Sequence, residues 1–285
     1  MQKMINSFFK MTLLHKPDFY VDPQHQATLA FNKLTTFDAV WELQVDWFED
    51  PNERRGGWSG VGRLDLSTIN DTKQGVFLKR QENHNRKTWL HPIQGIPTFA
   101  CEFNMMRFLV NKQVPSLVPI FFAVRNQRGN LQASLMTEEL VGFQSLEEAT
   151  EVHFSAKNAS RKQRRNLITQ VAQTVGKLHR AGVQHRSLYP KHLFVDKVGA
   201  RDVVVIDLEK SRTKWLPVMR TFYDLSTLNR HAKYWSKTSR LYFYKQYFQV
   251  EKLNVYQKWL LKLIVKRSSR QKNHSTAKKV YQGQK

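Results

Sequence analysis

The chain has little cysteine and no long apolar run. Its 285 residues contain one cysteine, Cys101, which excludes an internal disulfide and fits a reducing cytoplasm, where such a residue packs as a small hydrophobe. The first ten residues mix charged and apolar side chains and lack the apolar core of a secretory signal peptide. The longest apolar stretch near the C-terminus, 259–265, is broken by Lys262 and is much shorter than the roughly eighteen residues of a membrane span. We therefore expect a cytoplasmic protein.

Acidic residues are also scarce. There are 23 Asp and Glu against 46 Lys and Arg, so the formal net charge is +23 and favours polyanionic partners. The sequence lacks an RNP-type aromatic motif, a helix-turn-helix signature and a Cys/His set for zinc, so we expect no nucleic-acid partner. An anionic membrane surface is the better expectation, because residues 266–285 carry seven Lys or Arg and no acid. The alternative for this tail is a disordered, solubilising segment.

Residues 185–192 read HRSLYPKH and resemble the catalytic loop of the protein-kinase fold, whose pattern is H-R-D-x-x-x-x-N. In kinases the Asp of this pattern lies beside the acceptor hydroxyl, and the Asn binds the second magnesium ion. Here Ser187 has the place of the Asp and His192 has that of the Asn. The loop therefore predicts a kinase-like scaffold whose general base is missing or relocated.

The segments on either side of this loop fit the same pattern. Residues 193–195 and 203–206 read as two strands of a hairpin, which places Asp207 at a strand end, where the kinase D-F-G aspartate holds magnesium. Before the loop, apolar residues at helical spacing predict a helix over 161–181 that ends at Gly182.

A lysine, a glutamate and several glycines come earlier in the chain. Lys79 ends the run VFLK, in the form of the kinase V-A-I-K, and Glu102 lies on a helix predicted for 98–111, where it can hold the lysine against ATP phosphates. Glycines between two apolar-alternating segments supply backbone amides that could approach those phosphates. The predicted nucleotide-binding residues are Lys79 and Glu102 together with Gly57, Gly60, Gly62 and Glu138.

These residues resemble those of the lipopolysaccharide kinase (Kdo/WaaP) family over about residues 38–250, and a His at the Asn position is also found there. The phrases EDPNERR (49–55), TEELVGF (137–143) and IDLEKSR (206–212) are most similar to its InaA branch. The resemblance implies ATP and Mg²⁺ as cofactors and a lipopolysaccharide core sugar or related glycolipid as acceptor. It also implies a peripheral position at the cytoplasmic face of the inner membrane.

Each of these residues also has a simpler interpretation. Lys79 could be a solvated lysine, and Asp207 could cap a turn after a strand. His185 is more simply a core histidine that hydrogen-bonds the loop. His192 would bind Mg²⁺ poorly, since this ion prefers oxygen ligands, and could instead contact phosphate or acceptor. Asp224 resembles the buried aspartate that anchors the loop amides of kinases, and the alternative is an exposed carboxylate at a helix start.

The segment between Asp207 and Asp224 indicates the kind of acceptor. It is too short for the long activation loop and A-P-E element that position a peptide, so a protein substrate is disfavoured. It carries four basic residues that would attract a sugar with a phosphate or carboxylate, and the alternative is a solvated basic face. These residues are Lys210, Arg212, Lys214 and Arg220.

The residue that would act as general base is open. Ser187 does not ionise near neutral pH, so it can hydrogen-bond an acceptor hydroxyl without removing its proton as a carboxylate would. A missing base slows a phosphotransferase by about 10²- to 10⁴-fold without abolishing it. Glu209, in place of the D-F-G glycine, is the nearby carboxylate that could substitute. The candidate catalytic residues are Ser187, His185, Glu209 and Asp207, and the candidate metal ligands are Asp207 and His192.

We predict an α+β, two-lobed protein-kinase-like fold with a strand-rich N-lobe and a helical C-lobe. The predicted parts are an N-terminal extension (1–35), the N-lobe (36–137), the C-lobe (138–265) and a basic tail expected to be disordered (266–285).

Two function classes fit this set of residues. The first is an ATP-dependent phosphotransferase that acts on a phosphorylated or acidic sugar or glycolipid. The second is a catalytically impaired pseudokinase that serves as a nucleotide-binding, membrane-associated module. Nucleic-acid binding through charge alone is a third class, which the sequence supports less. Stabilisation by nucleotide, with and without Mg²⁺, is expected for the first two classes.

Overall fold

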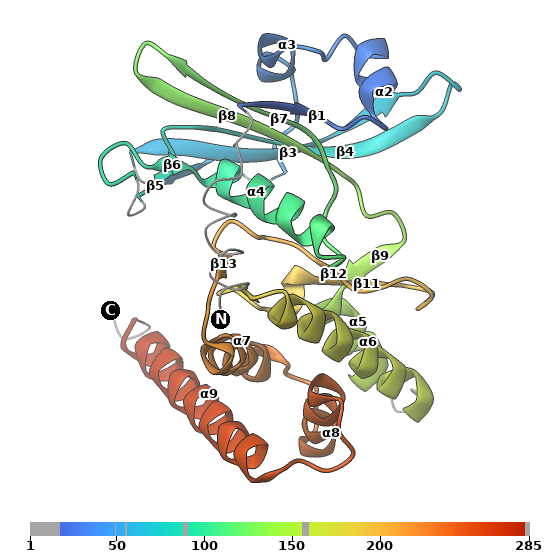
Figure 1. Ribbon diagram of the computed structural model, residues 1–285, viewed down its shortest axis with the longest axis vertical. Helices are drawn as coiled ribbons and strands as arrows, with labels where there is room; N and C mark the ends of the chain where they lie inside the picture. Colours follow the sequence, from blue (N-terminus) through green and yellow to red (C-terminus); the bar gives the residue numbers. More distant parts are fainter. Residues whose placement is uncertain (1–17, 49, 55, 88–90, 156–159, 283–285) are drawn as a thin grey trace, which may run out of the picture. The chain divides into compact units, whose positions relative to one another are not determined.

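The computed structural model describes residues 18–282 except 49, 55, 88–90 and 156–159, and it divides into two compact units (Figure 1). A strand-rich sheet forms most of unit 1, and unit 2 is mostly helical, in agreement with the α+β class that we predicted. The two-lobed arrangement stays a prediction. Unit 1 comprises Met1–Asn111 and Leu117–Val141, and unit 2 comprises Lys112–Ser116 and Gly142–Lys285.

Unit 1 is built on a six-stranded sheet in the order β1-β7-β8-β4-β3-β2, in which every neighbouring pair is antiparallel. Successive residues of β4 point to opposite faces. Leu78 is buried in the core on one face, and Lys79 points to the other face, in register with Val61 of β3 and Leu135 of β8. The strands are β1 (Phe19–Val21), β2 (Asn52–Arg54), β3 (Gly57–Ser67), β4 (Lys73–Glu82), β7 (Pro119–Gln127) and β8 (Asn130–Glu138).

Helices cover both faces of this sheet (Figure 1). On one face, Leu29 and Val40 join the core that contains Leu78. On the other face, Phe103 stacks on Phe122 with ring centroids 4.2 Å apart. The helices are α2 (Gln26–Phe31) and α3 (Phe37–Trp41) on the first face and α4 (Thr98–Asn111) on the second, and a short hairpin of β5 (Asn85–Arg86) and β6 (Ile96–Pro97) precedes α4. The helix α4 has the bounds that we predicted.

Residues 18–35 differ from the separate extension that we predicted. Strand β1 pairs with β7, with Phe19 opposite Ala123, and Leu29 and Leu34 are buried in the core of unit 1. This part of the chain gave no periodic signal because β1 has three residues and α2 has six, which is too short for an apolar repeat. Residues 1–17 lie outside the described part of the chain.

The helix that precedes the 185–192 loop forms as predicted. Helix α6 (Arg161–Arg180) begins at Ser160, whose hydroxyl accepts a hydrogen bond from the Lys162 amide. It ends just before Gly182, whose φ of +89° lies in the left-handed region that favours glycine. The predicted apolar stripe faces the core, since its residues are all buried: Leu167, Val171, Val175 and Leu178.

Two small sheets, ordered β12-β11-β9 and β10-β13, complete the surroundings of the loop. The antiparallel pair β11 and β12 is the hairpin that we predicted before Asp207. The elements are β9 (Phe143–Ser145), α5 (Leu146–Ser155), β10 (Val183–Gln184), the 3₁₀ turn η1 (Pro190–His192), β11 (Leu193–Asp196), β12 (Val204–Val205), β13 (Arg212–Thr213), α7 (Pro217–His231) and α8 (Lys237–Phe248).

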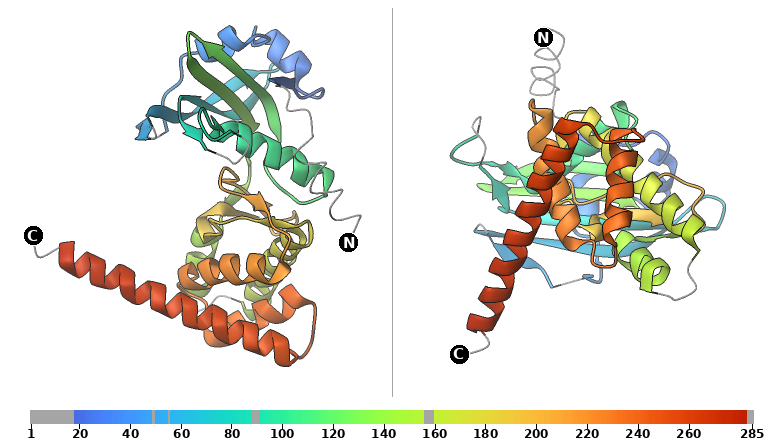
Figure 2. Two further views of the ribbon diagram at one scale, coloured as in Figure 1. Left: turned by 60° about the vertical axis from the view of Figure 1, so that its left-hand side comes forward. Right: turned by 90° about the horizontal axis from the view of Figure 1, so that it is seen from below.

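The last helix, α9 (Val255–Gln282), continues past residue 266, where we expected a disordered tail to begin (Figure 2). It packs along α7, and the buried hydroxyl of Ser268 donates to the Ser226 carbonyl over 3.0 Å. Residues 266–282 contain no Pro or Gly that would end a helix, so their helical state agrees with their composition. Within the described residues, no helix combines the length and the apolar character that crossing a bilayer requires.

Candidate active site

Lys79 and Glu102 form the ion pair that their order in the chain predicts. The Lys79 Nζ lies 2.7 Å from Glu102 Oε1. The side chain of Glu102 is 2% exposed and that of Lys79 is 15% exposed. A buried carboxylate needs a cationic partner, so Glu102 holds the lysine in place. The contact with ATP phosphates stays a prediction.

The glycines Gly57, Gly60 and Gly62 lie within strand β3, whereas we predicted them between two apolar-alternating segments. A Cβ built on Gly60 would lie 2.7 Å from the ring of Trp47, and one on Gly62 would lie 2.9 Å from the side chain of Val45. A Cβ on Gly57 would meet the Glu82 carbonyl at 2.1 Å. The absence of side chains at these positions therefore lets neighbouring chain segments pack against the strand. Their approach to phosphate stays a prediction.

Glu138 ends β8 and is bound by a residue that we did not predict. His25 Nε2 lies 2.7 Å from Glu138 Oε1, and His25 Nδ1 lies 2.7 Å from Asp22 Oδ2. The short DPQH run at 22–25 is a turn signal that could have indicated the first of these contacts. No local signal connects it to Glu138, more than a hundred residues away.

Asp224 anchors the 185–192 loop in unit 2. Its two carboxylate oxygens accept hydrogen bonds from the backbone amides of His185 (2.7 Å) and Arg186 (2.9 Å). Arg186 has a φ of +67°, a conformation that non-glycine residues adopt rarely and that such anchoring can maintain. Asp224 is 1% exposed and lies within α7, so it is the predicted anchor and not an exposed helix-start carboxylate.

The anchor continues into a buried network that we did not predict. His179 Nε2 lies 3.1 Å from Asp224, and His179 Nδ1 lies 2.7 Å from the hydroxyl of Tyr247. The Tyr247 hydroxyl also contacts Thr221 at 2.8 Å, and burial raises the pKa of Tyr247 to about 12. Since Asp224 only accepts, His179 donates from Nε2 and accepts from Tyr247 at Nδ1. The network keeps the Asp224 carboxylate in one orientation.

His185 is a structural residue of the loop. It is fully buried, its Nε2 donates to the Ile206 carbonyl over 2.9 Å, and its Nδ1 accepts from the Ser187 amide at 3.3 Å. Burial lowers its pKa, which keeps the ring neutral and suits one donor and one acceptor. The hydrogen bond to Ile206 connects the loop to the residue directly before Asp207.

Asp207 and His192 are brought together by this arrangement. His192 Nδ1 lies 3.2 Å from Asp207 Oδ2 and 2.8 Å from the Ser187 carbonyl, and the Ile206 amide donates to the His192 carbonyl over 3.0 Å. Asp207 has a φ of +57°, which is uncommon outside functional or tightly held positions. Burial lowers the pKa of His192, so the neutral ring donates from Nδ1 and leaves Nε2 as an acceptor.

Mg²⁺ takes hard oxygen ligands and commonly binds one or two carboxylates together with substrate phosphates. The carboxylate of Asp207 is 34% exposed and fits this role. His192 fits it less well, since it offers nitrogen and its Nδ1 proton is used within the chain. No cluster of three or more His, Cys, Asp or Glu side chains with metal-binding geometry occurs in the part of the chain that is described.

Ser187 and Glu209 are the candidates for interaction with an acceptor. Ser187 is 4% exposed, and its carbonyl accepts from the Tyr189 amide (2.7 Å) as well as from His192. Glu209 is half-buried and follows Asp207 by two residues. His192 therefore connects the backbone of residue 187 to Asp207, because its Nδ1 contacts both.

A basic pocket of about 430 Å³ lies against the 185–192 loop in unit 2. Two of its basic residues, Arg212 and Lys214, belong to the segment that we predicted. The other two come from the 185–192 loop and from α9, and we did not predict them. The predicted Arg220 does not line it, because its side chain is buried and donates to the Lys214 carbonyl. Asp224, already bonded to loop amides, is the one acid among the lining residues. The basic side chains of the pocket are Arg186, Arg212, Lys214 and Arg267.

Comparisons with known proteins agree with this geometry. The model of the lipopolysaccharide kinase (Kdo/WaaP) family matches residues 38–247. Protein InaA of Escherichia coli (strain K12) is 29% identical over 203 residues, which cover 70% of this chain and 90% of InaA. The solved structure of WaaP in complex with acyl carrier protein has a TM-score of 0.64 at 21% identity, and the match covers 88% of this chain and 98% of WaaP.

Proposed function

This chain belongs to the lipopolysaccharide kinase (Kdo/WaaP) family, and on that basis we propose that it is an ATP-dependent phosphotransferase whose acceptor is a phosphorylated or acidic sugar of a glycolipid. The observation that carries the proposal is the set of contacts that joins Asp224, His185, His192 and Asp207. It holds one partly exposed carboxylate in an uncommon backbone conformation beside the loop that would receive the acceptor.

The nucleotide would be held by Lys79, which Glu102 positions, and by the segment around Glu138. Asp207 would hold the magnesium ion, which neutralises phosphate charge during transfer. In unit 2, Asp224 and His185 would keep the loop rigid, and the His192 ring, held by its hydrogen bond to the Ser187 carbonyl, lies 3.2 Å from the Asp207 carboxylate. Rigid placement of this kind is the main contribution of protein groups to phosphoryl transfer.

The basic pocket supports an acidic acceptor. The pocket has four basic side chains and one acid, Asp224, whose oxygens already accept hydrogen bonds from loop amides. The four cations would therefore attract a phosphate or carboxylate on the sugar, and guanidinium groups bind such oxygens through paired hydrogen bonds. A glycolipid acceptor also agrees with the net charge of +23 and with a protein that works in the cytoplasm at the surface of the inner membrane.

The first prediction concerns Lys79. Replacing Lys79 with Met is expected to abolish the increase in melting temperature that Mg²⁺-ATP produces, because the substitution removes a phosphate contact. The fold should persist, but the melting temperature without nucleotide should fall, because the buried carboxylate of Glu102 loses its partner. Thermal unfolding with and without Mg²⁺-ATP measures both effects. Lys73→Met on the same strand is the matched control, since Lys73 is exposed. An unchanged nucleotide shift in Lys79→Met would remove Lys79 from the site.

The second prediction identifies the base. If an acceptor hydroxyl docks beside residue 187, Ser187→Asp places a carboxylate there and is expected to raise the phosphotransfer rate, by up to about 10²- to 10⁴-fold. If Glu209 is already the base, Ser187→Asp has little effect and Glu209→Gln is severely slowed. Turnover of ATP with an added lipopolysaccharide-core acceptor separates these outcomes.

The pseudokinase alternative rests on the same serine, which is buried and cannot ionise near neutral pH. Under it, Mg²⁺-ATP stabilises the protein, but neither Ser187→Asp nor Glu209→Gln changes turnover. Absence of a nucleotide-dependent melting shift in the wild type would contradict both the phosphotransferase and the pseudokinase.

A further inference from the structure

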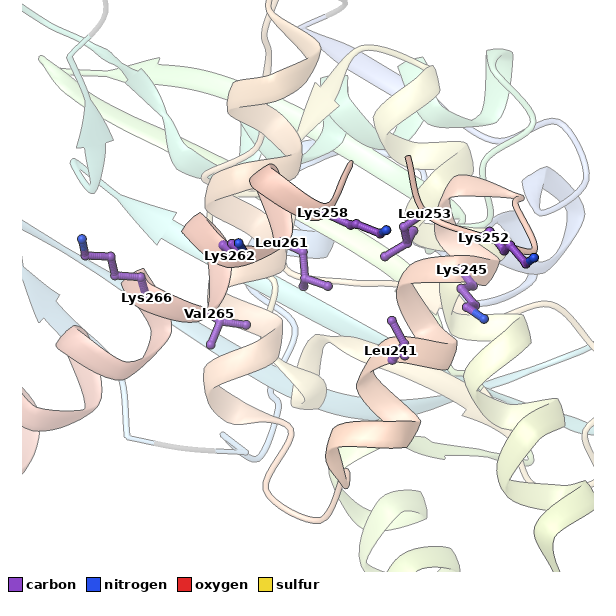
Figure 3. Close-up of a pocket in the computed structure, with 9 residues that line it drawn as sticks. All are labelled: Leu241, Lys245, Lys252, Leu253, Lys258, Leu261, Lys262, Val265 and Lys266. Atoms are coloured by element: carbon purple, nitrogen blue, oxygen red, sulfur yellow. The ribbon is translucent and has the colours of Figure 1, made fainter. Parts of the chain in front are cut away.

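A groove of about 680 Å³ runs between α8 and α9 in unit 2, and its lining residues include none of those assigned to the candidate active site (Figure 3). Its base is apolar. Leu241 comes from α8, Leu253 from the connection between the helices, and Leu261 and Val265 from α9. Leu253 is buried, whereas Leu241 and Val265 are more than two-fifths exposed. The groove therefore leaves an aliphatic surface open to solvent.

Five lysines surround this apolar base. They extend from both helices and from the connection, so positive charge lies on each side of the groove (Figure 3). No acidic residue lines it, and Glu251 in the connection is the neighbouring acid in the sequence. An occupant must therefore present negative charge and apolar surface together. The lysines are Lys245, Lys252, Lys258, Lys262 and Lys266.

Exposed aromatic side chains lie at the start of α9. Tyr256 and Trp259 are 52% and 50% exposed, with ring centroids 6.0 Å apart, and Val255 beside them is 84% exposed. Tyr and Trp are enriched at the boundary between lipid and water, where an apolar ring meets a polar headgroup layer. An acidic protein could also pair with the lysines, but it would not account for the exposed aromatic side chains as a membrane does.

We propose that the α8–α9 groove is the site at which this protein binds an anionic phospholipid membrane. The five lysines contact lipid phosphates, and the aliphatic base with Trp259 and Tyr256 enters the boundary between headgroups and acyl chains. The proposal is independent of catalysis, because none of these residues belongs to the candidate active site.

The test is sedimentation of the full-length protein with vesicles of phosphatidylcholine containing about one quarter phosphatidylglycerol, and with vesicles of phosphatidylcholine alone. The triple variant Lys258→Gln, Lys262→Gln, Lys266→Gln is expected to bind the anionic vesicles about 100-fold more weakly, since each basic residue near an anionic surface contributes about fivefold. A control triple variant with the same change in net charge, Lys73→Gln, Lys162→Gln, Lys197→Gln, uses exposed lysines elsewhere and should weaken binding by less than about threefold.

A second pair of variants tests the apolar part. Trp259→Ser is expected to weaken binding about tenfold, in proportion to the apolar area that would enter the membrane. Trp215→Ser is the control, because Trp215 is 63% exposed and, unlike Trp259, does not lie on α9. All substituted side chains are exposed, so the melting temperatures should stay close to that of the wild type.

Deletion of residues 271–285 tests the tail more cleanly than deletion of the whole basic segment 266–285. The longer deletion also removes Ser268, which is buried against α7. The shorter deletion keeps the groove and should leave the difference between the two triple variants intact.

Equal weakening in the two triple variants would show that only net charge matters and would overturn the proposal. So would groove-dependent binding to a soluble acidic polypeptide, tested as polyglutamate, without groove-dependent binding to vesicles. That result would assign the groove to an acidic protein.

Discussion

Replacing Asp207 with Asn is expected to reduce phosphate transfer by about 10³-fold or more, because the substitution removes the carboxylate that would hold the metal ion against the transferred phosphate. Asn has the same shape and also tolerates the left-handed backbone conformation that Asp207 adopts at a φ of +57°. The melting temperature should therefore stay close to that of the wild type, and the loss would be chemical. ATP turnover with a lipopolysaccharide-core acceptor is the measurement.

Asp202→Asn is the matched control for this experiment. Asp202 precedes the hairpin strand β12, and its side chain is 60% exposed and paired with Lys177. An exposed pair contributes little to stability, so both turnover and melting should be unchanged. Equal turnover in the wild type and in Asp207→Asn would end the phosphotransferase proposal for that acceptor and leave the nucleotide-binding alternative.

Replacing Asp224 with Ala is expected to lower the free energy of unfolding by about 3–5 kcal/mol. The carboxylate accepts hydrogen bonds from the amides of His185 and Arg186 and from His179, so all three donors would lose their partner, and those of His185 and His179 are buried. Arg186 would also lose the contact that holds its left-handed conformation. Urea denaturation measures the effect, and ATP turnover should fall with it as the loop loses its anchor.

The same measurement on Asp202→Ala gives the reference, for which we expect a change within about 0.5 kcal/mol. A change below about 1 kcal/mol in Asp224→Ala would mean that the loop is held by other contacts and that the buried network contributes little. Tyr247→Phe removes only the hydroxyl that donates to His179, and it should lower the free energy of unfolding by about 1 kcal/mol.

Several parts of the candidate site could be predicted because short stretches of sequence specify them. The apolar stripe of α6 with Gly182 after it, and the two apolar runs of the β11–β12 hairpin, depend on periodicity and turn chemistry within about twenty residues. Lys79 and Glu102 are farther apart, but each lies on an element that the sequence defines. The alternation of β4 then puts the lysine on the face that carries α4.

Other parts could not be predicted, because they depend on which elements pack together. The contacts of His179 with Tyr247 and of His25 with Glu138 join residues far apart in the chain, and no local pattern indicates them. The place of Arg267 in the basic pocket follows from α9 packing along α7. The sequence also does not show that Trp47 and Val45 fill the space above Gly60 and Gly62 of β3.

The sequence by itself determined the order of the chemical groups, namely the lysine, the glutamate, the 185–192 loop and Asp207, and with that order the family. It did so because each group lies on, or soon after, a strand or helix whose local pattern is strong. The tertiary structure decided that Ser187 is buried, that His192 donates to the Ser187 carbonyl and lies 3.2 Å from Asp207, and that five lysines gather around one apolar groove. These features depend on how whole elements pack against one another, which the free energy of the whole fold selects and no local repeat specifies.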